Sequence, residues 1–517
     1  MTNSAVPLAT DWVAHFTYVT PDKLATVDLA SERRQTYAQM HERVGRLASF
    51  LRAQGVDRGD RVGFLALNST DIIDLILAIW RVGGSALALN YRLTAPELEY
   101  IISDAVPKVL VFDTEFDAVA SELKNLTTIE HYIDFDGIGG SSTLEAGIAS
   151  ATPLYERVEQ PLTDECMLMY SSGTTGRPKG VIITHEMIRY SHFNGTAPSR
   201  ATSDDVWLTI MPQFHIGGLN VTSLPAISIG GTAVVMRMFD PDATLDAFND
   251  PELGITHTLG VPAMFNAMRF STKVETTDYS RMKSTLAGGA SVPKELVEWW
   301  YEKGLLIQDG YGMTESAASN CMTTRSDVPR IIGTSGKALQ FTDMKIVDEA
   351  GNEVPRGEAG EIWMRGPVIT PGYWNNEAAN RNSFHDGWFK SGDIARQDEE
   401  GNFILQDRAK DMYISGGENV YPAEVEGVLY EMEEIQEVAV IGMPDEKWGE
   451  TGCAVVVVCE GKSVDMKAIR EHCNAKLARY KHPMHLVTMD VLPRNATGKV
   501  KKFELRETVP DMLKEQS

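Results

Sequence analysis

The sequence predicts an α/β protein made of a large N-terminal domain and a small C-terminal domain. The chain has 517 residues, which is more than one hydrophobic core usually supports. Helix-like and strand-like stretches alternate over residues 1–160, as is typical of sheets with crossover helices. Near Lys410 the composition changes to charged residues, a Gly-Gly turn and a helix that begins at a proline. We therefore place the boundary at Lys410 and predict domains of residues 1–409 and 410–517.

The alternation is clearest in the first part of the chain. Residues 37–54 and 71–80 have the apolar spacing of helices, and residues 61–67 between them have the composition of a short buried strand. At residues 104–112 and 128–135, a few polar residues are again followed by an apolar run that is typical of a strand. This order favours a sheet whose strands are joined by helices.

Later stretches continue the pattern with shorter elements. Strands are predicted at 207–211 and 305–315, the second running into a turn, and small residues at 286–292 form a break between apolar segments. Residues 360–367 and 372–374 indicate a β-rich distal part of the large domain. In the small domain we expect buried strands at 438–442 and 454–459 and a helix at 464–477.

Composition excludes several classes of protein. Hydrophobic residues make up 43% and charged residues 23%, as in an ordinary globular protein. The formal charge of −24 argues against a nucleic-acid partner, because binding to a phosphate backbone requires clustered Lys and Arg. The five scattered cysteines contain no C-x-x-C pair, so we expect them to be reduced and structural. The sequence has no signal-peptide pattern and no run of about 18 apolar residues, so we expect a cytoplasmic protein without an integral membrane segment.

Residues 170–185 contain a candidate phosphate-binding loop. From Ser171 to Gly180 there are four hydroxyl side chains, three glycines, an arginine and a lysine, and no bulky apolar side chain. Such a segment can present N–H groups, hydroxyls and cations to phosphate oxygens. The pattern G-x-x-x-x-G-K-[ST] started at Gly173 would need glycine at Pro178, so a P-loop NTPase is disfavoured. The plain alternative is a flexible surface loop.

Two other segments could carry chemistry. Residues 309–315, Asp-Gly-Tyr-Gly-Met-Thr-Glu, follow a predicted strand, and strand ends are where α/β proteins bind ligands; the third glycine of the dinucleotide fingerprint is missing. Residues 479–482 and 494–502 are rich in Lys and Arg. An acidic protein that binds anionic substrates needs such a local concentration of positive charge. The simpler interpretation is an ordinary basic tail. His215 in Pro-Gln-Phe-His-Ile-Gly-Gly-Leu is, by residue type alone, more often a satisfied core histidine.

Taken together, these segments resemble the signature motifs of the adenylate-forming enzymes, the family of acyl-CoA synthetases, peptide-synthetase adenylation domains and beetle luciferases. The resemblance runs from about residue 30 to 506, and its motifs occur in family order: 170–185, 212–219, 311–315, 386–394, 407–426 and 493–499. It implies that the β-rich part belongs to the large domain and that the small α+β domain is mobile. It also assigns nucleotide and coenzyme A binding to Ser171, Ser172, Gly173, Thr174, Thr175, Gly176, Lys179, Gly289, Ala290, Asp309, Gly310, Tyr311, Gly312, Asp393, Arg408, Ser415, Gly416 and Gly417.

The resemblance gives individual roles to the nucleotide site. Tyr311 would stack on adenine, Thr314 would contact the α-phosphate, and Glu315 would hold Mg²⁺. Mg²⁺ suits one carboxylate beside nucleotide phosphates, because it keeps several waters and takes few protein ligands. Asp393 would accept both ribose hydroxyls, with Arg408 beside it.

The remaining roles concern the acid and the second step. His215 would gate the acyl pocket, and Lys499 would bridge the attacking carboxylate and the α-phosphate. After adenylation the small domain would swing about the hinge Lys410, withdraw Lys499 and bring residues 415–417 to the pocket mouth. The small residues Gly217, Gly218, Gly288, Gly289 and Ala290 predict a pocket with few obstructing side chains.

We therefore expect an ATP-dependent carboxylic acid:CoA ligase that uses ATP, Mg²⁺ and coenzyme A and releases AMP and pyrophosphate. The open pocket favours a medium- or long-chain fatty acid, or an aromatic acid of hydroxycinnamate or feruloyl type, over acetate. Its partners would be the small-molecule acid, ATP and CoA, with a homodimer left open. The alternatives are an enzyme that loads a carrier protein, a luciferase-like oxygenase, and a non-catalytic nucleotide or acyl-ligand sensor; the sensor is disfavoured because Lys499, Glu315 and Asp393 are all present.

Overall fold

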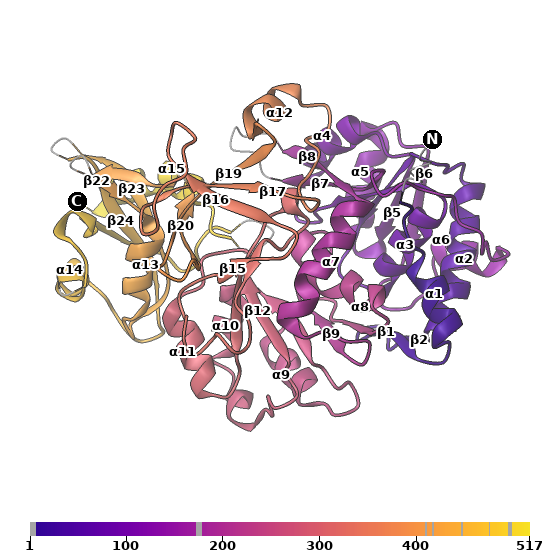
Figure 1. Cartoon of the computed structure of the whole chain (residues 1–517), viewed down its shortest axis with the longest axis horizontal. Helices are drawn as coiled ribbons and strands as arrows, with labels where there is room; N and C mark the ends of the chain where they lie inside the picture. Colours follow the sequence, from indigo (N-terminus) through magenta and orange to yellow (C-terminus); the bar gives the residue numbers. More distant parts are fainter. Residues whose placement is uncertain are drawn as a thin grey trace.

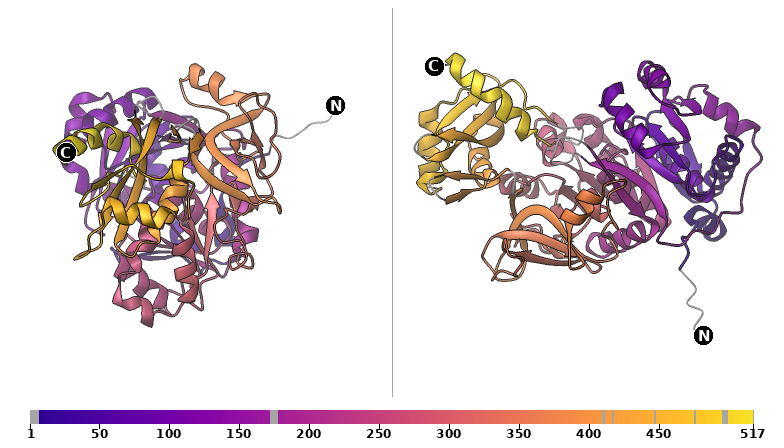
Figure 2. Two further views of the ribbon diagram at one scale, coloured as in Figure 1. Left: turned by 90° about the vertical axis from the view of Figure 1, so that its left-hand side faces the viewer. Right: turned by 90° about the horizontal axis from the view of Figure 1, so that it is seen from above.

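A computed structural model describes residues 7–171, 178–408, 411–415, 418–445, 448–474, 476–494 and 499–516, and we report on these residues (Figure 1). Two large sheets and a smaller antiparallel sheet form the N-terminal part. The C-terminal part, yellow in Figures 1 and 2, lies at one end of the molecule in Figure 1 and in the right-hand view of Figure 2. The predicted fold class, an α/β N-terminal domain with a β-rich part followed by a small α+β domain, is confirmed.

The first large sheet is built from the alternating N-terminal elements. Its strand order is β6-β5-β3-β4-β7-β8, and all neighbours are parallel except β7 and β8. The strands are β3 (Arg61–Leu65), β4 (Ser85–Leu89), β5 (Val109–Asp113), β6 (His131–Phe135), β7 (Glu165–Ser171) and β8 (Lys179–Thr184). The helices are α2 (Tyr37–Ala53), α3 (Thr70–Arg81), α4 (Ala95–Ala105), α5 (Asp117–Leu126) and α6 (Thr143–Ser150). Every residue of β3, β4 and β5 is buried, as expected for parallel strands covered on both faces.

The second large sheet has the order β15-β14-β13-β12-β11-β9-β10-β1-β2. Its strands are β1 (Leu24–Asp28), β2 (Arg34–Thr36), β9 (Val206–Thr209), β10 (Thr232–Val235), β11 (His257–Gly260), β12 (Ser284–Gly288), β13 (Ile307–Tyr311), β14 (Cys321–Met322) and β15 (Lys337–Ala338). Its helices are α1 (Trp12–Val19), α7 (His185–Ser199), α8 (Leu224–Ser228), α9 (Pro241–Asn249), α10 (Pro262–Met268) and α11 (Lys294–Glu302). Six neighbouring strands of this sheet run parallel, namely β1, β10, β9, β11, β12 and β13. The strands β2, β14 and β15 pair antiparallel with their neighbours.

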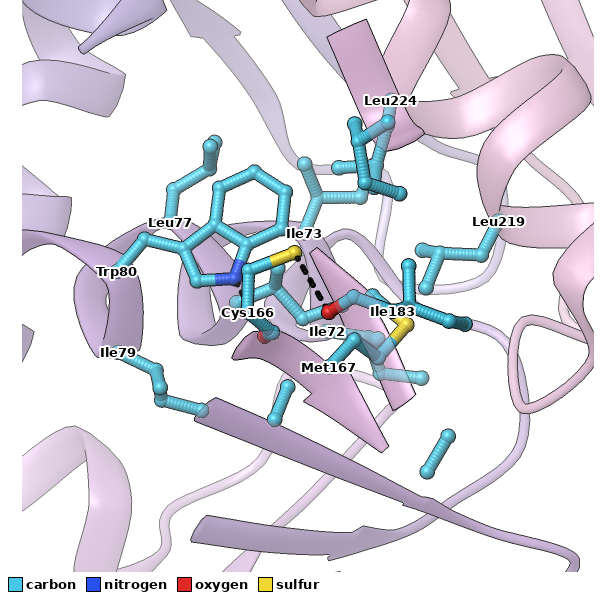
Figure 3. Close-up of a cluster of buried hydrophobic side chains, with 14 of the residues drawn as sticks. Ile72, Ile73, Leu77, Ile79, Trp80, Cys166, Met167, Ile183, Leu219 and Leu224 are labelled. Carbon is cyan, nitrogen blue, oxygen red and sulfur yellow. Dashed lines mark hydrogen bonds between the residues drawn. The ribbon is translucent and has the colours of Figure 1, made fainter. Parts of the chain in front are cut away.

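One hydrophobic core joins the two large sheets. In Figure 3, Ile72, Ile73 and Trp80 of α3 lie beside Cys166 of β7, while Leu219 and Leu224 approach from the second sheet. The Trp80 indole N–H donates a 2.8 Å hydrogen bond to the Cys166 carbonyl, and the Cys166 thiol donates to the Ile183 carbonyl at 3.5 Å. All five cysteines are free, and four of them are buried.

The β-rich part is a small antiparallel sheet. Strand order is β16-β17-β19-β18, and β20 pairs with β19. The elements are β16 (Asp343–Val347), β17 (Gly360–Arg365), α12 (Glu377–Ser383), β18 (Phe384–His385), β19 (Trp388–Gln397) and β20 (Phe403–Arg408).

The C-terminal part has a sheet of its own with helices on both faces. Its elements are β21 (Tyr413–Ser415), β22 (Glu418–Val420), α13 (Pro422–Tyr430), β23 (Ile435–Asp445), β24 (Gly449–Val458), α14 (Met466–Asn474), β25 (His485–Thr488) and α15 (Lys502–Gln516). Val438 and Val440 of β23 pack with α13 and α14, whereas their neighbours Ala439 and Ile441 pack with α15. This alternation follows from the opposite directions of successive strand side chains.

Several predicted boundaries were wrong by a few residues. The strand predicted at 61–67 ends at Leu65, and the segment 104–112 is the end of α4 followed by β5, because a polar lead and a helix end look alike in sequence. Within 372–374, Tyr373 forms an isolated bridge with Val181 of β8. The helix predicted at 464–477 spans 466–474.

Among the residues described, no helix is both long and apolar enough to cross a membrane.

Candidate active site

Strands β7 and β8 bring together the two ends of the candidate phosphate loop. Ser171 ends β7, Lys179 begins β8, and the two residues are antiparallel partners. The loop between them, with the predicted residues Ser172, Gly173, Thr174, Thr175 and Gly176, lies outside the described residues. The Lys179 ammonium lies 5.2 Å from the centre of the Tyr373 ring. A hydroxyl and a cation therefore flank the loop at the end of a hairpin.

Glu315 meets this hairpin from the other large sheet. It lies with Thr314 in a short 3-10 turn, η4 (Thr314–Ser316), after β13. Its Oε1 accepts hydrogen bonds from the Ser171 hydroxyl at 3.2 Å and from the Tyr373 hydroxyl at 3.1 Å. The side chain of Glu315 is buried, and both of these donors are neutral. A buried carboxylate held by neutral donors is suited to a metal cation, because the cation would offset the cost of its desolvation.

The exit of β13 is shaped by glycines that have no room for a side chain. A Cβ at Gly288 would lie 2.7 Å from the Gly310 carbonyl oxygen, and one at Gly312 would lie 1.3 Å from the Ala318 carbonyl oxygen. Gly289, with a φ of +77°, and Ala290 continue the neighbouring strand end. Glycine at positions 288 and 312 therefore allows neighbouring backbone segments to pack closely.

Two acidic residues lie at this exit. Asp309 accepts a 2.8 Å hydrogen bond from the Ser335 hydroxyl, and burial raises the pKa of its carboxyl to about 7. Asp393 on β19 accepts a 2.8 Å hydrogen bond from the Tyr311 hydroxyl. Arg408 on β20 is the backbone partner of Asp393, and the Arg408 side chain lies outside the described part of the chain.

His215 lies between β9 and a π-helical turn, η2 (Gly218–Ser223). Its Nδ1 accepts a 3.2 Å hydrogen bond from the Gly217 N–H, which leaves the ring proton on Nε2. Burial and the Lys499 ammonium lower the pKa of His215 to about 3, so the imidazole is neutral near pH 7. The charge of Lys499 in the C-terminal part thus acts on His215 in the N-terminal part.

A further contact joins the two parts. The Asn266 amide donates a 3.2 Å hydrogen bond from its Nδ2 to the Gln436 carbonyl, connecting α10 with β23. Ser415 is buried at the end of β21. The predicted residues Gly416, Gly417 and Lys410 lie outside the residues that the structure describes.

A cavity lies beside η2, between α7 and the second large sheet. Its volume is ≈ 50 Å³. Its walls include Trp207, Val221, Leu286 and Met322, together with hydroxyl, amide and imidazole side chains. Neither this polar wall nor the contact of Tyr373 with Glu315 was predicted from the sequence. A π-helical turn is a frequent mark of functional sites, but the segment 218–223 has no sequence signal that separates it from an ordinary helix.

Comparisons with known proteins match almost the whole chain. Residues 13–374 match the family model described as AMP-binding enzyme, and residues 424–499 match the AMP-binding enzyme C-terminal domain. A feruloyl-CoA synthase from Amycolatopsis sp is 38% identical over 91% of this chain and 93% of that protein. The long-chain-fatty-acid–CoA ligase FadD13 from Mycobacterium tuberculosis is 35% identical over 95% of this chain and 97% of that protein. The crystal structure of ATP-bound MatB from Rhodopseudomonas palustris superposes with a TM-score of 0.89 at 32% identity, covering 98% of this chain and 99% of that chain.

Proposed function

The chain belongs to the family of AMP-binding enzymes, and on that premise we propose that it joins a fatty or aromatic carboxylic acid to coenzyme A. The enzyme is an AMP-forming acid–thiol ligase that uses ATP, Mg²⁺ and CoA. The acid is proposed to be a medium- or long-chain fatty acid or an aromatic acid of hydroxycinnamate or feruloyl type. Both kinds of acid occur among the relatives, as feruloyl and long-chain fatty substrates.

One observation carries this proposal: the Ser171 hydroxyl donates a hydrogen bond to the buried carboxylate of Glu315. The ends of the phosphate loop thus lie beside a buried carboxylate, and the Lys499 ammonium of the C-terminal part lowers the pKa of His215. Adenylation has to bring a carboxylate to the negatively charged α-phosphate. Positive groups fixed before the reaction are suited to reduce that repulsion.

In the first step, a carboxylate oxygen of the acid attacks the α-phosphorus of ATP, and the bond from that phosphorus to pyrophosphate breaks. We propose that Lys499 spans the carboxylate and the α-phosphate, Thr314 contacts that phosphate, and the loop from Ser171 to Lys179 holds the leaving pyrophosphate. Mg²⁺, for which Glu315 is the proposed ligand, would neutralise the phosphate oxygens. The described residues hold no cluster of three or more His, Cys, Asp or Glu side chains, so nucleotide oxygens and water would complete its coordination.

The nucleoside would be held at the exit of β13. We propose that Tyr311 stacks on adenine, with the backbone of residues 309–312 and 289–290 close to it, and that Asp393 with Arg408 binds the ribose. Support comes from the narrow glycine-lined strand ends and from the hydrogen bond between Tyr311 and Asp393. His215, which is neutral near pH 7, is the proposed gate for the acid.

In the second step, the CoA sulfur attacks the acyl carbonyl carbon, the carbon–oxygen bond to AMP breaks, and the thiol proton is released. We propose that the domain of residues 410–517 turns about Lys410, so that Lys499 leaves and Ser415, Gly416 and Gly417 come to the pocket mouth. The C-terminal part has its own core on both faces of its sheet, which supports movement as a unit.

A panel of acids tests this function. AMP release is measured with ATP and Mg²⁺, with and without CoA, using alkanoic acids of increasing length and cinnamic acids. We expect acid-dependent AMP turnover that requires CoA. Turnover that requires an acyl-carrier protein in place of CoA would favour carrier loading. ATP binding in calorimetry with no AMP from any acid would favour the sensor and contradict the ligase.

A further inference from the structure

The turn that carries Thr314 and Glu315 continues into two residues with a strained backbone. Ala317 has a φ of +52° and a ψ of +32°, and Ala318 has a φ of +102°. Positive φ is unfavourable for residues that have a Cβ, and glycine usually occupies this region. Such a backbone persists only where the surrounding structure holds it, and it is frequent at functional sites. The contacts that hold the two alanines therefore bear on the proposed metal ligand beside them.

Two side chains from outside the turn hold the carbonyl of Ala317. The Ser191 hydroxyl, on α7, donates to this oxygen at 2.6 Å, and the Asn220 Nδ2, on η2, donates to it at 2.6 Å. The amide of Asn220 is itself oriented by His192, whose Nε2 lies 2.7 Å from the Asn220 Oδ1. Ser191, Asn220 and Ala317 are all buried. Two donors on one buried carbonyl fix its direction, and with it the peptide that joins the two strained alanines.

This peptide closes the turn that contains Glu315. The Ala317 N–H donates to the Thr314 carbonyl at 3.1 Å. The Ala318 N–H donates to the Met313 carbonyl, also at 3.1 Å. The backbone of Glu315 thus lies inside a turn whose C-terminal end is held by α7 and η2. A movement of the strained peptide would therefore change the direction of the Glu315 side chain.

We propose that Ser191 and Asn220 are positioning residues that hold Glu315 in the orientation required for Mg²⁺. They act through the carbonyl of Ala317. This inference rests on the proposed function, in which Glu315 binds the metal beside the nucleotide phosphates. Ser191 and Asn220 both lie outside the sequence motifs of the family, so the assignment comes from their contacts.

The main test is Ser191→Ala, which removes one donor from the Ala317 carbonyl and keeps the other. The readout is the Mg²⁺ concentration for half-maximal rate of acid-dependent pyrophosphate release, with the acid of highest turnover. We expect this concentration to rise by about threefold to tenfold, the usual effect of one lost hydrogen bond. Ser191→Ala/Asn220→Ala removes both donors and should raise it further. Thermal unfolding checks that each variant is folded, and the single variant is sufficient if the double variant does not fold.

Ser199→Ala is the matched control. Ser199 also lies on α7, and its hydroxyl donates to the Gly195 carbonyl at 2.6 Å, within the helix itself. The control removes a hydroxyl of the same kind without changing the contacts of Ala317, so the Mg²⁺ requirement should stay within about twofold of the wild type. An unchanged requirement in folded Ser191→Ala, or an equal shift in both variants, would overturn the inference.

Two double variants separate positioning from a general loss of structure. In Ser191→Ala/Ala318→Gly, glycine adopts positive φ without strain, so the Mg²⁺ requirement should return toward the wild-type value. Ser191→Ala/Glu315→Gln should require the same Mg²⁺ concentration as Glu315→Gln alone, because the serine acts through that carboxylate. No recovery with glycine, or a further rise beyond Glu315→Gln, would contradict the proposed positioning.

Failure of this inference can be distinguished from failure of the proposed function. The Mg²⁺ requirement is measured on enzyme that releases pyrophosphate, so each contrary result above leaves the ligase activity in place. Absence of pyrophosphate release by the wild type with every acid of the panel would instead contradict the proposed function, and the inference with it.

Discussion

The Tyr311 hydroxyl donates a 2.8 Å hydrogen bond to Asp393 Oδ2 and so joins the second large sheet to the β-rich part. Burial, together with the Asp393 charge, raises the pKa of Tyr311 well above its usual value, so the phenol keeps its proton and remains the donor. Tyr311, which is proposed to stack on adenine, thus forms a hydrogen bond with Asp393, which is proposed to bind the ribose. The carboxylate of Asp393 is therefore oriented before ATP arrives.

Removing this hydrogen bond should weaken ATP binding without removing the aromatic ring. We expect Tyr311→Phe to raise the Kd for ATP by about tenfold, because a hydrogen bond to a charged group contributes about 1.5–3 kcal/mol. Asp393→Ala should weaken binding more, and the double variant should resemble Asp393→Ala alone, because the tyrosine acts through the carboxylate. Isothermal titration calorimetry with ATP and Mg²⁺ measures all three. Additive losses would contradict this coupling.

Glu315 should control the requirement for Mg²⁺. Glu315→Gln keeps the shape and can still accept from Ser171 and Tyr373, but it removes the charge. We expect kcat for pyrophosphate release to fall by about 10²–10³, the usual cost of one electrostatic group, and the Mg²⁺ concentration for half-maximal rate to rise. The matched variant Tyr373→Phe removes one neutral donor and should leave the Mg²⁺ dependence nearly unchanged. Equal Mg²⁺ curves for Glu315→Gln and the wild type would rule out the metal role.

Local patterns predicted the elements well, and they could not predict contacts between distant residues. The helix near 37–54 follows from apolar spacing, since its buried residues repeat at helical intervals, whereas the helix near 71–80 is buried all round. Ser171 and Glu315 were both named from their motifs, but their hydrogen bond spans 144 residues and depends on how two sheets pack. His192 lies within an ordinary helix, and its hydrogen bond to Asn220 depends on how α7 packs against η2.

Asp309 should make stability depend on pH. The pKa of its carboxyl is about 7 in the folded protein, above the ordinary value of 3.8. Between pH 3.8 and pH 7 the folded state therefore keeps a proton on this carboxyl that the unfolded state has lost. Its contribution to the unfolding free energy is therefore full below about 4 and is lost as the pH rises to about 7. Asp309→Asn, which is always neutral, should be more stable than the wild type at pH 8 by at least about 1 kcal/mol and closer to it at pH 5.5. Urea unfolding without nucleotide at both pH values measures this, and a difference that does not change with pH would contradict it.

Lys499 should be needed for only one of the two steps. Its ammonium lowers the pKa of His215, the proposed gate for the acid. Lys499→Ala should therefore reduce acid-dependent pyrophosphate release by at least about 10²-fold, because no other group replaces its charge between two anions. It should spare thioester formation from a supplied acyl-adenylate and CoA, because the sulfur attacks after the lysine has withdrawn.

The control is Lys501→Ala, which removes an exposed ion pair with Glu504. This variant should leave both rates within about twofold, because exposed ion pairs contribute little. Equal loss of both half-reactions in Lys499→Ala would show that the lysine does not leave between them, and the proposed turn about Lys410 would then be wrong.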